Sequence, residues 1–269
     1  MKRTLVLGSI LIAGILAAID LDLRPGQLVP GRDGWAVIGR FFRAAFTPTL
    51  TSQSELQSDL LPRIFEGAYN TIVFAAAAIS LSLVVGLILG VLASESWWRL
   101  FPATRVVRPV LYGATRTLIS FMRSIHELLW ALALLSAFGL NTAAAVIAIA
   151  IPYSGTLAKV FSEMLDEAPP ETATALRFAG ASSLQVFTFG LLPRALPDMG
   201  AYAFYRFECA LRSAAILGFF GFETLGKFIE ESVAELYFRE AWTFLYTLFI
   251  MIVIVEWWSG ALRRRLTVA

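Results

Sequence analysis

Long apolar windows constrain this sequence more than any other feature. Several windows of about 18 or more residues hold few or no charged side chains, which is long enough for a helix to cross a hydrocarbon core of about 30 Å. Charged residues make up only 16% of the 269 residues, and the mean hydropathy is +0.71. A soluble domain carries about 25% charged residues. The sequence therefore predicts an all-α polytopic membrane protein.

Six membrane-spanning helices are predicted. They cover Leu5–Ile19, about Asn70–Ala93, part of Pro109–Phe138, about Thr142–Val160, Gly200–Phe222 and Trp242–Leu262. The first is short and follows Lys2-Arg3, so a cleaved signal peptide is an alternative interpretation. Residues Ala17 to Asp20 form a poor cleavage site, which favours a retained helix.

The distribution of Lys and Arg predicts the orientation of these spans. If both termini are cytoplasmic, that side receives more Lys and Arg residues than the outer side does, including Arg263 to Arg265 near the end of the sequence. The outer loop from Glu223 to Glu240 is acidic. This asymmetry follows the positive-inside rule, and we expect a multi-pass protein of the bacterial inner membrane.

The sequence divides into an N-terminal part, residues 1–62, and a membrane domain, residues 63–269. The first part holds one span and a long outer connection. Within that connection, residues Trp35 to Phe46 alternate bulky apolar side chains with Arg40 and Arg43. This pattern suits a short helix lying in the membrane interface. A partly ordered loop is the alternative.

Composition excludes several kinds of chemistry. The single cysteine, Cys209, excludes an internal disulfide and a cysteine metal cage, and the single histidine, His126, excludes two-histidine zinc motifs. The sequence has no Gly-rich Walker loop, so we do not expect this chain to bind ATP itself. We therefore predict no catalytic residue, no metal site, no cofactor on this chain and no nucleic-acid partner.

A partly polar segment, residues about 161–199, interrupts the apolar pattern between the fourth and fifth spans. Pro169 to Glu171 predict a helix start, because proline fits the first turn and an acidic residue favours the positive end of the helix dipole. Gly180 suits the left-handed residue that ends a helix. Ser182 with Gln185 has the form of a capping box for a second helix.

The predicted helix, glycine turn and helix would protrude from the membrane domain. Pro193 and Pro197 are expected to break the chain before the fifth span. An ordinary connector is the alternative interpretation. A capped helix pair exceeds what a connector needs, so we predict that it docks into the cleft of a partner.

This segment resembles the loop by which permease subunits of ATP-binding-cassette importers dock into a groove on the ATPase subunit. The family pattern is Glu-Ala-Ala, three residues, Gly, nine residues, Ile, any residue and Leu-Pro. Ala175, Gly180 and Leu192-Pro193 keep that spacing here. The positions that depart from the pattern hold Thr174, Leu176 and Gly190. Glu171, one turn earlier, is a substitute for the missing glutamate.

Three longer stretches of sequence make the resemblance more specific. The sequences "ALRFAGASSLQVFTFGLLPRALP", "YRFECALRSAAILGFFG" and, upstream, "MRSIHELLWALAL" are similar to permeases of phosphonate-type importers, over about Leu118 to Gly226. Two departures are His126, where the family usually has proline, and "GFETLG" at Gly221 to Gly226, which replaces a more glycine-rich turn.

The resemblance implies a fold, partners and a cargo. The fold is the type I importer permease core, with about six helices and a cytoplasmic coupling helix pair. The partners are a second permease copy, two ATPase subunits that bind ATP and Mg, and a periplasmic solute-binding protein. The cargo is a phosphonate or a related phosphorus oxyanion such as phosphite or a phosphate ester. The residues expected to dock on the ATPase are Glu171, Thr174, Ala175, Arg177, Gly180, Ala181, Ser182, Leu192 and Pro193.

Charged residues inside the predicted spans are costly unless they are paired or hydrated, which favours a functional interpretation. Glu208 and Arg212 are four residues apart in the fifth span, so an ion pair on one helix face is expected, with Arg206 pointing away from it. The third span repeats this spacing with Arg123 and Glu127, so these two residues are also expected to share a helix face. The pairs either line the path of an anion or lock helices together. The candidate residues are Arg123, His126, Glu127, Arg206, Glu208 and Arg212.

Two other functions stay open. An importer of the same architecture could carry a different small solute, such as an amino acid or an organic cation, although arginines in the path disfavour a cation. A stand-alone secondary transporter or channel would need no ATPase. The amphipathic helix pair from Glu171 to Pro193 argues against that second alternative.

Overall fold

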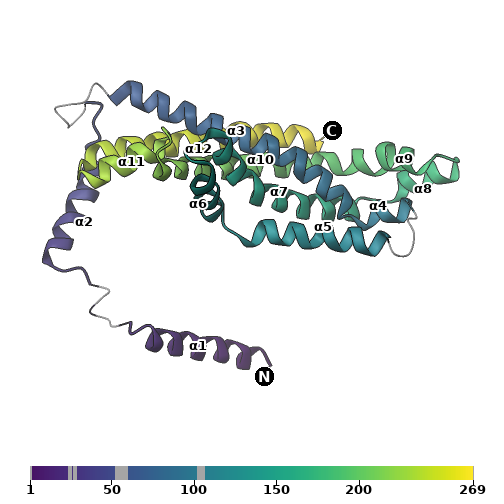
Figure 1. Ribbon diagram of the computed structural model, residues 1–269, viewed down its shortest axis with the longest axis horizontal. Coiled ribbons are helices and arrows are strands. Elements are labelled where there is room, and N and C mark those ends of the chain that lie inside the picture. Colours follow the sequence, from purple (N-terminus) through teal and green to yellow (C-terminus); the bar gives the residue numbers. More distant parts are fainter. Residues whose placement is uncertain (1, 24–25, 27–28, 52–59, 102–106, 269) are drawn as a thin grey trace. The chain divides into compact units, whose positions relative to one another are not determined.

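The computed structural model describes residues 2–23, 26, 29–51, 60–101 and 107–268. The chain forms two compact units, residues 1–48 and 49–269. Every regular element in the described ranges is helical, as the sequence predicts (Figure 1). The predicted boundary at residue 62 falls inside the second of these units.

The first unit holds two helices. Helix α1, Lys2–Asp20, is apolar along most of its length, and α2 spans Arg32–Ala45. Helical spacing places Arg40 and Arg43 on one side of α2 and Trp35 and Phe42, both more than half exposed, on the other. The amphipathic helix is therefore present, and its position in the membrane interface stays a prediction.

The second unit is a bundle of helices. In Figure 1, α3, α5, α7, α10 and α12 run along its length, α8 and α9 form one end, and α11 lies at the other. Its elements are α3 Leu60–Leu92, α4 Glu95–Leu100, α5 Val107–Ser124, α6 Glu127–Phe138, α7 Thr142–Glu167, α8 Glu171–Phe178, α9 Ser183–Gln185, the π-helical η2 Val186–Leu191, α10 Leu192–Ile216, the 3-10 helix η3 Leu217–Phe220, α11 Leu225–Ala234 and α12 Phe238–Val268.

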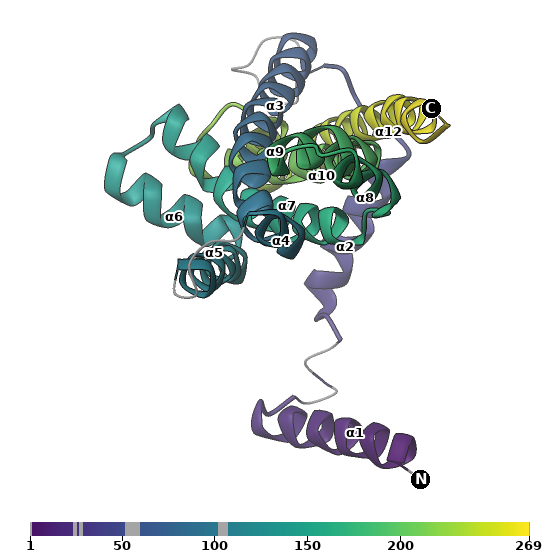
Figure 2. The same ribbon diagram turned by 90° about the vertical axis from the view of Figure 1, so that its right-hand side faces the viewer.

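Helix α7 is the centre of this bundle. It packs against α3, α5, α6 and α10, which surround it in the end-on view of Figure 2. Two glycines of α3 allow the closest of these contacts. A Cβ on Gly86 would lie 2.8 Å from Leu157 Cβ, and one on Gly90 would lie 3.0 Å from Phe161 Cβ. These separations are below van der Waals contact, so larger residues would push α3 away from α7.

Three helices among the described residues are long and apolar enough to cross a membrane, namely α3, α7 and α12. The number rises to four when α5 and α6 are counted as one bent span. Helix α1 is apolar but shorter, and α10 carries five charged residues (Arg194, Asp198, Arg206, Glu208 and Arg212). The total of about six spans stays a prediction that depends on α1 and α10. The side chain of Arg265, used for the orientation, lies outside the described residues.

The predicted third span is broken. Helix α5 ends at Ser124, α6 begins at Glu127, and their axes differ by 89°. His126 caps α6, since its Nδ1 accepts a hydrogen bond from the Leu128 N–H at 3.3 Å. The expectation that Arg123 and Glu127 share a helix face is therefore wrong, because the two residues belong to different helices.

The expected break before the fifth span is also wrong. Elements α9, η2 and α10 follow one another without interruption from Ser183 to Ile216. Pro193 lies in the first turn of α10, where the missing N–H is tolerated, and Pro197 lies inside that helix. The second arm of the helix pair therefore continues directly into α10.

Both glycines of "GFETLG" have a structural role at the join between η3 and α11. Gly221 has a φ of +95°, in the left-handed region that favours glycine. A Cβ on Gly226 would lie 2.0 Å from the carbonyl oxygen of Ala215. The start of α11 therefore touches the end of α10 through backbone atoms.

Candidate functional site

The first candidate site is the 171–193 unit, which comprises α8, the Gly180 turn, α9, η2 and the first turn of α10. Helix α8 ends in a Schellman motif. The Ala181 N–H donates to the Leu176 carbonyl, and the Gly180 N–H donates to the Arg177 carbonyl, both at 3.0 Å. Gly180 has a φ of +82°. The predicted glycine turn is confirmed.

The second arm begins with the predicted capping box. The Gln185 N–H donates to Ser182 Oγ at 3.4 Å, and the Ser182 N–H donates to Gln185 Oε1 at 2.9 Å. Helix α9 is only one turn long and passes into the π-helical η2. Segments of π-helix are rare and occur frequently at functional sites.

The two arms pack tightly against each other. A Cβ on Gly190 of η2 would lie 3.1 Å from Ala173 Cα on the buried side of α8. Arg194 Nη2 also donates to Thr172 Oγ1 at 3.3 Å. Gly190 stands where the importer loop has isoleucine, and its small size gives α8 room to approach η2.

The 171–193 unit exposes large apolar side chains on both of its arms. Phe178 is 88% exposed, Phe189 is 70% exposed, and Leu184 is more than half exposed. The sequence interpretation did not single out these three residues. Of the predicted docking residues, Glu171, Thr174, Ala175, Arg177, Gly180, Ser182 and Pro193 are exposed, while Ala181 and Leu192 are half-buried.

A second candidate site lies inside the bundle, where α6, α7 and α10 meet around Tyr153. Ser213 Oγ donates to Glu127 Oε1 at 2.8 Å, so the Tyr153 hydroxyl, 2.9 Å away, donates to Ser213. The Arg206 guanidinium covers the Tyr153 ring, with its Cζ 4.4 Å from the centroid. His126 Nε2 is 3.6 Å from Glu127 Oε2. Three predicted residues therefore gather beside the α5–α6 break.

Two arginines lie at this site, the partly buried Arg206 and the exposed Arg123. Arg206 Nε is buried and has no hydrogen-bond partner among the described residues. The side chain of Arg123 passes over Gly155 of α7, where a Cβ would lie 2.9 Å from Arg123 Cγ. Tyr202 lies within electrostatic range of both arginines. A buried donor that lacks an acceptor favours an anion at this position.

The expected pair of Glu208 with Arg212 is wrong. The buried Glu208 carboxylate instead accepts from Arg263 Nη2 of α12 at 3.1 Å. Arg212 is exposed, and its Nη2 is 3.3 Å from Cys209 Sγ. Four-residue spacing made the Arg212 pair geometrically feasible, but the packing of α12 on α10 brings a different arginine to the buried carboxylate.

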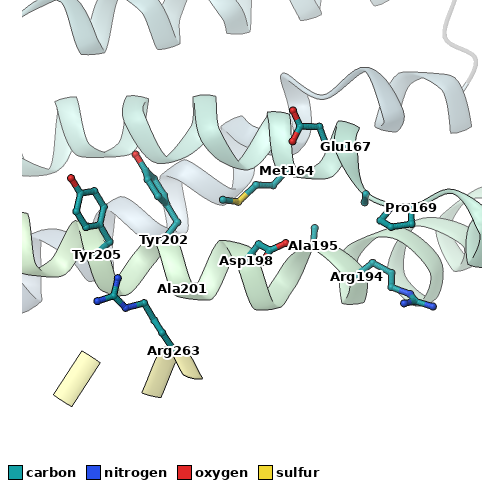
Figure 3. A pocket seen from close by; sticks show the side chains of 11 residues that line it. Met164, Glu167, Pro169, Arg194, Ala195, Asp198, Ala201, Tyr202, Tyr205 and Arg263 are labelled. Atoms are coloured by element: carbon teal, nitrogen blue, oxygen red, sulfur yellow. The ribbon is translucent and has the colours of Figure 1, made fainter. Parts of the chain in front are cut away.

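A polar stripe runs along α10 from Arg206 toward the 171–193 unit. Arg194, Asp198, Tyr202 and Arg206 follow one another at every fourth position, so neighbouring members share a helix face while the stripe winds gradually around α10. The outer part of the stripe lines an open cavity of about 560 Å³ (Figure 3). The other polar side chains of this cavity are Glu167, Tyr205 and Arg263.

Besides the three exposed apolar residues of the 171–193 unit, the sequence interpretation missed the polar stripe of α10 and three residues inside the bundle. The α10 stripe could have been found from its four-residue spacing, which is visible in the sequence. Tyr153, Ser213 and Arg263 carry no such local signal, because each meets a partner that lies 53 to 86 residues away in the sequence. The contacts are Tyr153 with Arg206, Ser213 with Glu127 and Arg263 with Glu208.

The Glu208–Arg263 pair gives a testable stability prediction. Glu208→Gln is expected to lower the free energy of unfolding by about 2 kcal/mol, because Arg263 loses a desolvated carboxylate partner. The double variant with Arg263→Gln should recover most of that loss. Thermal unfolding in detergent measures both effects. Arg212→Gln is the control and should change stability by less than about 0.5 kcal/mol; a loss equal to that of Glu208→Gln would contradict the assigned pair.

Comparison with known proteins places this geometry in context. The profile of the family described as binding-protein-dependent transport system inner membrane component matches residues 86–268. The phosphite transport system permease protein PtxC of Stutzerimonas stutzeri is 26% identical over 225 residues, which cover 80% of this chain and 78% of that protein. The phosphate-import permease protein PhnE of Mycolicibacterium smegmatis is 28% identical over 203 residues, or 76% of this chain but 37% of that protein.

Solved structures support the fold. A chain of the MetNI methionine ABC transporter in an inward-facing conformation superposes with a TM-score of 0.66 at 20% sequence identity. The match covers 80% of this chain and 99% of that chain. At this identity the likeness concerns the fold alone.

Proposed function

Because the chain belongs to the family of binding-protein-dependent transport system inner membrane components, we propose that it is the membrane permease of an ATP-driven importer for a phosphonate or a related phosphorus oxyanion. Members of this family are transport subunits and not enzymes. The observation that carries the proposed cargo is that relatives covering 80% and 76% of this chain are named for phosphite transport and phosphate import.

The 171–193 unit is the proposed docking site for the ATPase subunit. Its exposed apolar side chains, among them Phe178 and Phe189, are costly in water, and covering them with a partner is favourable. The Schellman turn and the tight Ala173–Gly190 contact hold both arms in one arrangement. A force applied to this unit therefore passes directly into α10, because no loop separates η2 from that helix.

The polar stripe of α10 is the proposed path toward the cytoplasm. Arg206, whose buried Nε has no hydrogen-bond partner in the described part of the chain, supplies a positive position beside the α5–α6 break. Tyr202, Asp198 and Arg194 continue from it into the open cavity. A transported anion must be attracted but released again. The acidic side chains in the same cavity keep its positive charge moderate. Arg123, His126, Glu127 and Arg212 are the further candidates for this path or its gate.

The family implies a partner ATPase, a solute-binding protein and pairing of permeases. We propose two permease copies, two ATPase subunits that bind ATP and Mg, and a periplasmic binding protein. Both termini are then cytoplasmic, and the 171–193 unit faces the ATPase. The N-terminal residues 1–62 contribute one span and a periplasmic connection in which α2 lies in the membrane interface.

Reconstitution tests this proposal. The permease is co-expressed with the ATPase and the solute-binding protein encoded beside it, and uptake of phosphite, methylphosphonate and phosphate into proteoliposomes is measured. ATP-dependent uptake of at least one of these anions is expected, and an ATPase variant without its Walker lysine should abolish it. Uptake that needs no ATPase would identify a secondary transporter. ATP-driven uptake of amino acids alone would assign a different cargo to the same architecture.

A further inference from the structure

A second link joins the 171–193 unit to the bundle, and it passes through the short helix α4. Helix α4 follows the end of α3 after Ala93 and Ser94. The Trp97 ring of α4 lies 4.2 Å from the Phe101 ring and meets the buried Phe187 ring of η2 edge to face at 4.8 Å. Helix α4 therefore connects α3 to η2 by a route that is separate from α10.

Asp166 in the last turn of α7 holds the N-terminus of α4. Its Oδ1 accepts hydrogen bonds from Ser94 Oγ at 2.7 Å and from the Ser96 N–H at 2.8 Å. Its Oδ2 accepts from the Glu95 N–H at 3.1 Å. A helix N-terminus has unpaired N–H groups and a partial positive charge, so a carboxylate satisfies both requirements there.

The position of Asp166 on its own helix is unfavourable without this contact. Negative charge destabilises the C-terminus of a helix, and α7 has no basic residue in its last turn. The N-terminus of α4 supplies the compensating positive end. Ser94 is fully buried in this arrangement. Ser94 is the N-cap of α4, because its Oγ accepts a hydrogen bond from the Trp97 N–H at 3.4 Å. The Asp166 carboxylate is a second acceptor, supplied by α7, for the first two N–H groups of α4.

We propose that Asp166 is a positioning residue for coupling, because it fixes α4 as a rigid link that carries displacement of the 171–193 unit to α3. This inference rests on the proposed function, since the displacement would come from a docked ATPase. When η2 moves, Phe187 displaces Trp97. The motion reaches α3 only if the N-terminus of α4 is anchored; without the anchor, α4 pivots and ATP hydrolysis proceeds without opening the path.

The test is the amount of phosphorus oxyanion imported per ATP hydrolysed by the reconstituted importer. Asp166→Ala should still bind the ATPase, but its import per ATP should fall by about fivefold, the size of effect expected from losing a carboxylate at a helix N-terminus. Asp166→Asn keeps one oxygen acceptor, so its import per ATP should lie between those of the wild type and Asp166→Ala. Glu95→Gln is the matched control, because it removes an acidic side chain from the same helix end while keeping the backbone N–H that Asp166 binds.

If Asp166→Ala imports as much phosphorus oxyanion per ATP hydrolysed as the wild type does, this inference is overturned. A wild-type complex that neither binds an ATPase nor imports a phosphorus oxyanion would instead overturn the proposed function. If Asp166→Ala fails to assemble, Ser94→Ala provides a second variant, because it removes the hydroxyl that donates to Asp166. Wild-type import per ATP in that variant would also contradict the inference.

A cross-link separates loss of the link from general damage. In a Cys209→Ser background, Asp166→Cys and Ser96→Cys allow a short thiol cross-linker to join α7 to the start of α4, where Asp166 binds the Ser96 N–H. Without the cross-link this variant should show the low import per ATP expected for loss of Asp166, and the cross-link should raise it toward the wild-type value. Failure to raise it in an assembled complex would show that the effect of Asp166 does not pass through α4.

Discussion

Gly180→Val is expected to reduce ATP-driven uptake by at least about tenfold while leaving the protein in the membrane. Gly180 has a φ of +82°, and apart from its chain neighbours no heavy atom of the described residues lies within 4 Å of a Cβ built there. The cost is therefore backbone strain and not a steric clash, about 1 to 3 kcal/mol for a β-branched residue in the left-handed region. Relief of that strain breaks the Schellman hydrogen bonds and redirects α8 relative to η2.

Two measurements on Gly180 variants separate docking from folding. Uptake in Gly180→Val should fall at least about tenfold, which corresponds to the expected strain, and less ATPase should co-purify with the permease. Gly180→Asn is the matched control, because asparagine tolerates the left-handed region better than other residues with a Cβ. Its uptake should stay near the wild-type value. Normal uptake and ATPase recovery in Gly180→Val would remove the docking hypothesis.

Arg206→Gln is expected to reduce uptake of the phosphorus oxyanion by about tenfold to a hundredfold, the effect of losing one charge-assisted hydrogen bond to an anion. Folding should change little, because glutamine retains polar donors and Arg206 has no carboxylate partner to leave unpaired among the described residues. Uptake and thermal unfolding in detergent are measured on the same preparation.

A second arginine provides the control for Arg206. Arg116 of α5 also covers a tyrosine, with its Cζ 5.2 Å from the Tyr112 ring centroid, but it hydrogen-bonds to that tyrosine on its own helix. Arg116→Gln should therefore keep wild-type uptake. Equal loss in both variants would indicate a general effect of removing positive charge. Full uptake in Arg206→Gln would end the case for Arg206 as a path residue.

Sequence alone was sufficient for features held together by neighbouring residues. Apolar windows predicted the long helices α3, α7 and α12, since the bilayer requires about 20 apolar residues per span. Pro170, Gly180 and the Ser182–Gln185 box predicted the helix ends in the 171–193 unit, because each hydrogen bond at these ends joins residues three to five positions apart. The amphipathic helix α2 was visible in the same way.

Tertiary structure decided which distant groups meet. Glu208 has an arginine at helical spacing, yet it pairs with Arg263, because burial of the α10–α12 contact brings that guanidinium to the carboxylate and leaves Arg212 exposed. Asp166 finds its donors about 70 residues away at the start of α4. These pairings depend on the rotation and offset of whole helices, which are fixed by close contacts such as Gly86 with Leu157. Periodicity along one helix says which residues share a face, but only packing between helices determines what that face touches.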